Sequence, residues 1–115
     1  MRRILLVEDE AIIAMTTEDM LDELGYEKIV TAASVAQALA AIADTQFDAA
    51  LLDVNLDGEF STPVAAALDA QRVPYALATG YGSAAPGIVS SNAPVITKPY
   101  TAATLAATIA GLLKG

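Results

Sequence analysis

The sequence has 115 residues, which fits one domain with its own core, and a hydrophobic share of 55% is typical of a globular protein. The net charge of −8 disfavours binding to nucleic acid and to anionic membranes and favours a role that involves other proteins. The lack of cysteine and histidine excludes disulfides and imidazole ligands, so any metal site must use oxygen ligands, which favours Mg²⁺.

The chain opens with a strand and helix pattern. Residues 3–7 are an apolar run typical of a buried strand, and residues 10–24 follow as a predicted helix. Gly25 is suited to end this helix. The apolar positions that we expect to face the core lie at helical spacing, namely Ile13, Met20 and Leu24.

Two further strand and helix units follow. A second strand is predicted at residues 28–33, and a capping-box pattern that begins at Ser34 opens an alanine-rich helix at residues 34–43. The apolar run 49–53 predicts a third strand. A serine and a proline after an acidic loop mark the start of a helix at residues 61–71.

The last third of the chain adds two strands and a helix. Strands are predicted at residues 75–79 and 95–97. The segment 80–94 between them is rich in glycine and proline, so we expect its helix to be short or mobile. The final helix, residues 101–113, carries an apolar face of Leu105, Ile109 and Leu112.

Five strands that alternate with helices imply a parallel sheet covered on both faces, because parallel neighbours need crossover connections. In such sheets ligands bind beyond the carboxyl ends of the strands. Each polar residue at a strand end is by itself typical of a turn or cap. Here five of them converge on one sheet edge: Glu8, Asp9, Asp53, Thr79 and Lys98.

These side chains suit metal-assisted phosphoryl transfer. Three carboxylates in one crevice repel one another, and a bound Mg²⁺ converts this cost into attraction. Lys98 can pair with Asp53 or with a phosphoryl oxygen, and Thr79 can donate a hydrogen bond to another phosphoryl oxygen. We therefore predict that Asp53 is a phosphoryl acceptor at the end of a buried strand.

Four segments of the sequence match a known pattern jointly: residues 7–10 (VEDE), 51–55 (LLDVN), 78–80 (ATG) and 97–100 (TKPY). Through them the whole chain, residues 1–115, resembles the receiver domains of two-component response regulators. The resemblance implies an α/β, flavodoxin-like (CheY-like) doubly wound sheet of five parallel strands in the order 2-1-3-4-5. It implies Mg²⁺ bound by Glu8, Asp9, Asp53 and the backbone carbonyl of Asn55, and a cis peptide bond before Pro99.

The resemblance also implies a mechanism and partners. Asp53 takes a phosphoryl group from a phosphohistidine on a sensor histidine kinase or phosphotransfer protein, while Lys98 neutralises charge and Thr79 moves toward the phosphoryl group. The changed surface then binds a downstream protein target. No turnover substrate is expected. Nucleic acid and membrane partners are not expected either, because the net charge is −8 and no stretch is long enough to span a bilayer. The expected location is the cytoplasm.

Two departures concern the switch. Receivers commonly carry an aromatic residue three positions before the lysine, where this chain has Val95. The run that begins at Leu77 resembles the single-domain subgroup whose fourth strand ends in Phe-Ala-Thr-Gly, with leucine in place of phenylalanine. Tyr81 is a candidate for part of the switching role, with an exposed loop tyrosine as the alternative, and Tyr100 is expected to be a packing residue.

Several alternatives stay open. The chain begins at Met1 and ends after its last predicted helix, which favours a stand-alone regulator over a receiver excised from a hybrid kinase or larger regulator. An aspartyl-nucleophile phosphohydrolase is disfavoured because Asn55 stands where such enzymes carry a second aspartate. A receiver fold without phosphorylation is disfavoured by the complete residue set, and a nucleotide-binding fold by the lack of a glycine-rich loop after the first strand.

Overall fold

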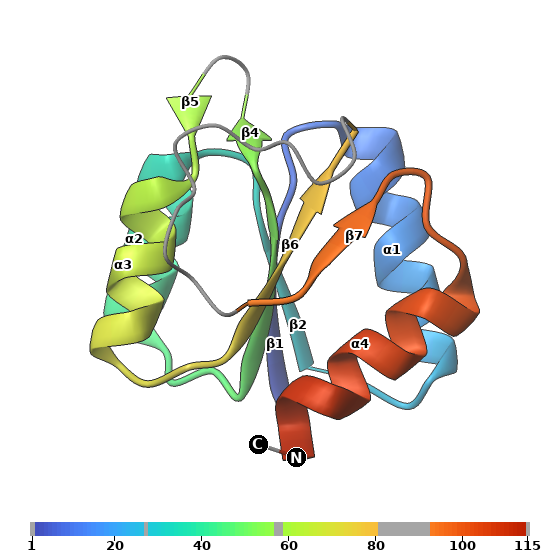
Figure 1. Cartoon of the computed structure of the whole chain (residues 1–115). Helices are drawn as coiled ribbons and strands as arrows, with labels where there is room; N and C mark the ends of the chain where they lie inside the picture. Colours follow the sequence, from blue (N-terminus) through green and yellow to red (C-terminus); the bar gives the residue numbers. More distant parts are fainter. Residues whose placement is uncertain (1, 27, 57–58, 81–92, 115) are drawn as a thin grey trace.

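The computed structural model describes residues 2–26, 28–56, 59–80 and 93–114. In this part of the chain a five-stranded parallel sheet has the order β2-β1-β3-β6-β7 (Figure 1). Its strands are β1 Arg3–Val7, β2 Lys28–Ala32, β3 Ala49–Asp53, β6 Tyr75–Thr79 and β7 Val95–Thr97. The helices are α1 Ala11–Glu23, α2 Val35–Asp44, α3 Thr62–Ala70 and α4 Ala102–Lys114. Along the sheet this is the predicted order 2-1-3-4-5, which is confirmed.

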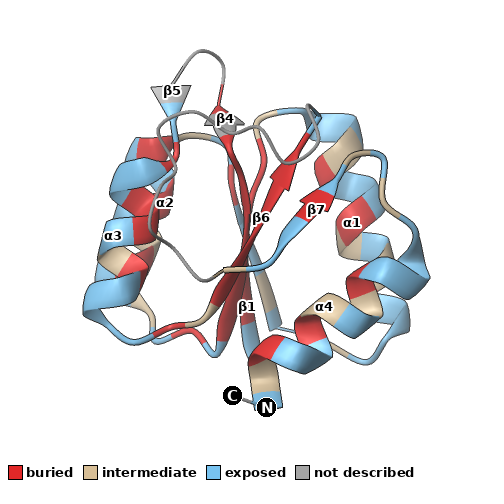
Figure 2. Cartoon of the chain, viewed as in Figure 1, coloured by how far each residue is buried: buried red, intermediate tan, exposed pale blue. Residues whose placement is uncertain are grey.

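The sheet is the middle of three layers. Helices α2 and α3 cover one face, and α1 and α4 cover the other (Figure 1). Side chains of the central strands alternate between the two faces: Leu5 and Val7 of β1 join the core under α2 and α3, whereas Ile4 and Leu6 join the core under α1 and α4. The central strands are therefore buried on both sides, as Figure 2 shows.

The C-terminal end of α1 and the N-terminal end of α2 have the capping interactions that the sequence predicts. Gly25 has a φ of +96°, and the N–H of Tyr26 donates to the carbonyl of Leu21 at 3.0 Å, which closes α1. At the start of α2 the hydroxyl of Ser34 accepts the N–H of Gln37 at 3.1 Å. These local signals fix where the helices end, and the predicted bounds agree with the observed ones to within one residue.

The prediction for the buried face of α1 is confirmed only in part. The buried residues of this helix are Ala14, Thr17 and Leu21. Met20 is partly buried and packs against the core under α1 and α4, Ile13 is partly buried, and Leu24 is 40% exposed. Apolar residues occur almost all the way round the first turns of this helix, so hydrophobicity alone could not select the face. The face predicted for α4 is confirmed, since its three apolar residues are buried.

A short antiparallel hairpin follows β3 and was not predicted. Its strands are β4, Asn55–Leu56, and β5, Glu59–Phe60. Strands of two residues carry no detectable pattern. A short or mobile helix was expected in the segment 80–94 between β6 and β7. Positions 81–92 of this segment lie outside the described residues. None of the helices that the structure describes is long and apolar enough to cross a membrane.

Candidate phosphoacceptor site

The polar residues singled out from the sequence lie at one edge of the sheet. The parallel register pairs Val7 with Leu52 and Asp53 with Ala78, so the strands end at nearly the same level. Glu8 therefore follows β1 directly beside the end of β3, and Lys98 follows β7. The hydrogen-bond register of the sheet, rather than proximity in sequence, brings these side chains together.

Three carboxylates gather at this edge. One carboxylate oxygen from each of Glu8, Asp9 and Asp53 lies within 4.8 Å of the other two. Glu8 is 3% exposed and Asp53 is 7% exposed, whereas Asp9 is partly buried. A cluster of carboxylate oxygens that retains access to solvent is the kind of donor set that suits Mg²⁺.

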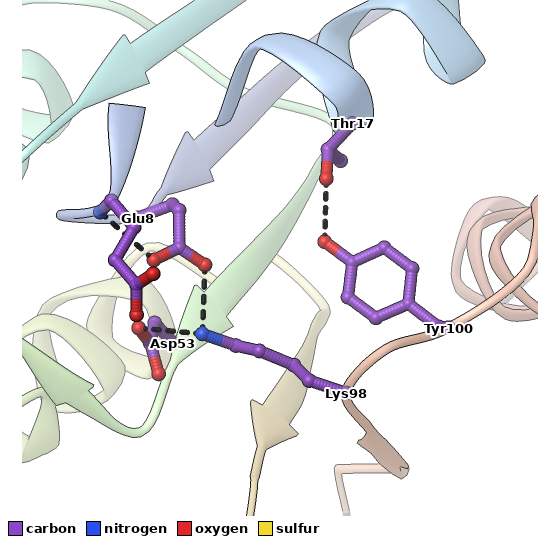
Figure 3. Close-up of polar contacts among 6 residues, drawn as sticks. Glu8, Thr17, Asp53, Lys98 and Tyr100 are labelled. Atoms are coloured by element: carbon purple, nitrogen blue, oxygen red, sulfur yellow. Dashed lines mark hydrogen bonds and ion pairs between the residues drawn. The ribbon is translucent and has the colours of Figure 1, made fainter. Parts of the chain in front are cut away.

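The Lys98 side chain extends toward Glu8 and Asp53, as Figure 3 shows. Its Nζ atom lies 2.9 Å from Oδ2 of Asp53 and 2.9 Å from Oε1 of Glu8. The other oxygen of Glu8, Oε2, accepts the backbone N–H of Glu10 at 3.1 Å. The pairing of Lys98 with Asp53 was anticipated from the sequence, but its equally close contact with Glu8 was not.

Burial and charge act against each other in this cluster. Burial raises the pKa of Glu8 from 4.5 to about 7, although the hydrogen bond from Lys98 partly offsets this effect. Burial alone lowers the pKa of Lys98, but its hydrogen bonds to Glu8 and Asp53 outweigh burial and raise the pKa above its usual value. Lys98 is therefore positively charged at neutral pH, whereas the carboxyl group of Glu8 titrates close to neutral pH.

The candidate switch residues lie on β6 and β7. Thr79 ends β6 and is buried, and its carbonyl accepts the backbone N–H of Lys98 at 2.9 Å. Val95, which stands at the usual aromatic position, is 43% exposed at the start of β7. Tyr81 lies outside the described residues. Asn55 begins β4, two residues after Asp53, and the Lys98–Pro99 peptide bond is cis.

Comparison with known proteins then decides the family. The sequence matches the response regulator receiver domain over residues 4–110. The chain belongs to this family. Receiver domains accept phosphoryl groups in two-component signalling, interact with kinases or phosphotransfer proteins and with downstream targets, and are generally signalling modules rather than enzymes. No curated protein matches the sequence.

Solved receiver structures agree with this assignment. The solution structure of SdrG from Sphingomonas melonis Fr1 is 45% identical, with a TM-score of 0.82 and coverage of 98% of this chain and 97% of that one. The receiver domain of PhyR from Erythrobacter litoralis is 30% identical (TM-score 0.84; 98% and 90% covered). The receiver domain of the sensor histidine kinase PA1611 from Pseudomonas aeruginosa PAO1, solved with a magnesium ion in its active site cleft, is 25% identical (TM-score 0.86; 99% and 98% covered).

The segment that carries Lys98 makes a polar contact with α1 that was not predicted from the sequence. The hydroxyls of Tyr100 and Thr17 lie 2.6 Å apart. Burial raises the pKa of Tyr100, which keeps its hydroxyl protonated. Tyr100 also packs against the core under α1 and α4, as expected of a packing residue. The available signal was the position of Thr17, three residues after Ala14 and four before Leu21 on one helix face.

Proposed function

We propose that Asp53 is the phosphoacceptor of this receiver domain. The observation that carries the proposal is the position of the Lys98 ammonium, 2.9 Å from Oδ2 of Asp53 at the carboxyl edge of the sheet. A cation at this distance can neutralise charge on a phosphoryl group attached to that oxygen. Asp53 is also one of the three clustered carboxylates, so the acceptor and the candidate metal ligands share one site.

Glu8, Asp9 and Asp53 are the side chains that we propose hold Mg²⁺, together with the backbone carbonyl of Asn55. The fit rests on one carboxylate oxygen of each side chain, all within 4.8 Å of one another, and on the oxygen-only donor set. When bound, Mg²⁺ supplies positive charge to the phosphoryl oxygens. The magnesium ion in the PA1611 receiver domain supports the same cofactor here.

The proposed reaction is an in-line displacement at phosphorus. A carboxylate oxygen of Asp53 forms a bond to the phosphorus of a phosphohistidine while the phosphorus–nitrogen bond breaks, and the electron pair remains on the imidazole. Lys98 neutralises the charge that gathers on the phosphoryl oxygens. Water later attacks the phosphorus of the acyl phosphate, the bond between phosphorus and the Asp53 oxygen breaks, and inorganic phosphate leaves. The Asp53 carboxylate is restored, so the domain resets without a turnover substrate.

In this proposal, phosphorylation changes the conformation of β6 and β7. We assign the first step to Thr79, whose hydroxyl moves to donate a hydrogen bond to a phosphoryl oxygen. Val95 provides no aromatic ring to follow that movement, and this favours a role for Tyr81 in the switch. The rearranged surface then binds a downstream protein target.

We propose that this receiver domain acts as a stand-alone regulator in the cytoplasm. The chain matches 97% of the SdrG chain at 45% identity, so a comparably short chain forms a receiver structure. The proposed phosphodonor is a sensor histidine kinase or a histidine phosphotransfer protein. The mass of the full gene product in its native cells distinguishes this arrangement from a receiver that forms part of a larger regulator.

The proposal is tested by transfer of labelled phosphate from acetyl phosphate. We expect labelling of the wild type that chelation of Mg²⁺ abolishes, no labelling of Asp53→Asn, and normal labelling of Asp44→Asn, which changes an exposed carboxylate at the end of α2. Equal labelling of Asp53→Asn and wild type would overturn the proposal. Steady turnover of phosphomonoesters that depends on Asp53 would instead identify a phosphohydrolase.

A further inference from the structure

The contact between Thr17 and Tyr100 joins α1 to the segment that carries Lys98. Their hydroxyl oxygens lie 2.6 Å apart (Figure 3). Thr17 is only 1% exposed and lies in the buried stripe of α1 between Ala14 and Leu21, both of which are apolar. A hydroxyl in such a position is costly unless it is hydrogen-bonded. The hydroxyl of Tyr100 is therefore the partner that makes a threonine tolerable in this stripe.

The segment that follows β7 is short and anchored at three points. At its start the backbone N–H of Lys98 donates to the carbonyl of Thr79 at 2.9 Å. At its end the hydroxyl of Thr101 accepts the N–H of Thr104 at 3.1 Å, which caps α4. Tyr100 lies between these anchors. Its contact with α1 therefore helps to set the backbone position from which the Lys98 side chain extends.

Packing between α1 and this segment is incomplete. A groove of about 390 Å³ runs between them, with Ile12, Ile13 and Met20 on the α1 side and Lys98 and Tyr100 on the other. Since an open groove leaves little packing to hold its walls in register, a hydrogen bond between those walls gains importance. Thr17 and Tyr100 provide that hydrogen bond.

We propose that Thr17 and Tyr100 are positioning residues for Lys98. Their hydrogen bond holds the segment after β7 against α1 and thereby keeps the Lys98 ammonium between Glu8 and Asp53. The inference rests on the proposed function, since it assumes that Lys98 neutralises the phosphoryl group on Asp53. Thr17 and Tyr100 act only through the lysine, so their loss should slow phosphorylation without weakening the metal site.

The test compares Tyr100→Phe, Thr17→Val and the double variant with wild type. The rate of phosphorylation at saturating acetyl phosphate should fall about 3- to 10-fold in each single variant, which is typical for loss of one hydrogen bond. It should fall no further in the double variant, because both changes remove the same bond. Thr17→Ser should retain the wild-type rate. Mg²⁺ affinity should not fall in any variant, because the three carboxylates lie on other segments and a displaced Lys98 ammonium opposes the metal less.

The matched control is Thr16→Val, which removes a neighbouring hydroxyl of α1 that donates to the carbonyl of Ile12 within the same helix. A second readout needs no phosphodonor: the NMR resonance of Lys98 Cε should shift in Tyr100→Phe and Thr17→Val but not in Thr16→Val. An unchanged Lys98 resonance would overturn the inference, even if Asp53 is phosphorylated normally. A shifted resonance in a protein whose Asp53 takes no phosphate would instead refute the proposed function and leave the positioning role standing. Additive rate losses in the double variant would also overturn the inference.

Discussion

The ammonium nitrogen of Lys98 lies 2.9 Å from Oε1 of Glu8, a residue that we propose as a ligand of Mg²⁺. Because Oε2 of Glu8 already accepts the N–H of Glu10, both oxygens of this carboxylate are engaged. A metal ion that binds Glu8 must therefore share the carboxylate with Lys98, and two cations near one carboxylate repel each other. Lys98 and Mg²⁺ are thus linked through Glu8 as well as through Asp53.

Replacement of Lys98 by alanine should therefore strengthen Mg²⁺ binding while it disables signalling. We expect the Mg²⁺ dissociation constant of Lys98→Ala to fall about five-fold or more, as expected for removal of a like charge a few ångströms away. The conformational response to phosphorylation should be lost. Calorimetric titration measures the first effect and NMR the second. Lys114→Ala, a change of an exposed lysine at the end of α4, should alter neither; weaker Mg²⁺ binding in Lys98→Ala would contradict this account.

The raised pKa of Glu8 predicts a specific dependence of stability on pH. In the folded protein this pKa is about 7, whereas the ordinary value is 4.5. Between these values the folded state holds a proton that the unfolded state has lost, so the contribution of Glu8 to stability falls as pH rises through this window. Above about pH 7 it becomes constant.

Glu8→Gln isolates this contribution, because glutamine resembles the protonated carboxyl and does not titrate. Urea unfolding of both proteins, in the absence of Mg²⁺, gives their free energies of unfolding at each pH. From pH 5 to pH 8 the wild type should lose stability relative to Glu8→Gln. Parallel stability curves for the two proteins would show that the pKa of Glu8 is not raised.

The core under α4 should be sensitive to truncation. Ile109 is fully buried, and Ile109→Ala should lower the free energy of unfolding by about 2–5 kcal/mol, because it leaves a cavity. Ile12→Ala makes the same chemical change on α1 at a side chain that is 80% exposed. It should cost only about 0.5 kcal/mol or less. Similar losses from the two variants would mean that α4 does not pack as described.

The strands and the candidate site followed from the sequence because their signals are local. The run 49–52 is apolar on both faces, and the polar Asp53 directly after it marks the carboxyl edge. The face of α4 was predictable because its apolar residues form one stripe. The face of α1 was not, since its apolar residues surround the helix and only contact with the sheet selects among them. Ile12 and Met15 are accordingly 80% and 64% exposed.

The contacts that refine the site are long-range and leave no periodic signal. Glu8 and Lys98 are 90 residues apart in the sequence, and their pairing depends on the register of four strands and on the direction of one long side chain. Thr17 and Tyr100 are 83 residues apart, and each by itself has an ordinary structural explanation. Sequence alone could name the charged residues but could not say which carboxylates share the lysine.

The most direct test of the central claim is the location of the phosphoryl group itself. The protein is treated with acetyl phosphate and Mg²⁺, the acyl phosphate is reduced with borohydride, which converts a phosphorylated aspartate to homoserine, and peptides are mapped by mass spectrometry. We predict homoserine at position 53 and at no other aspartate, and none in Asp53→Asn. Homoserine at another aspartate of the wild type, with Asp53 unmodified, would contradict the account.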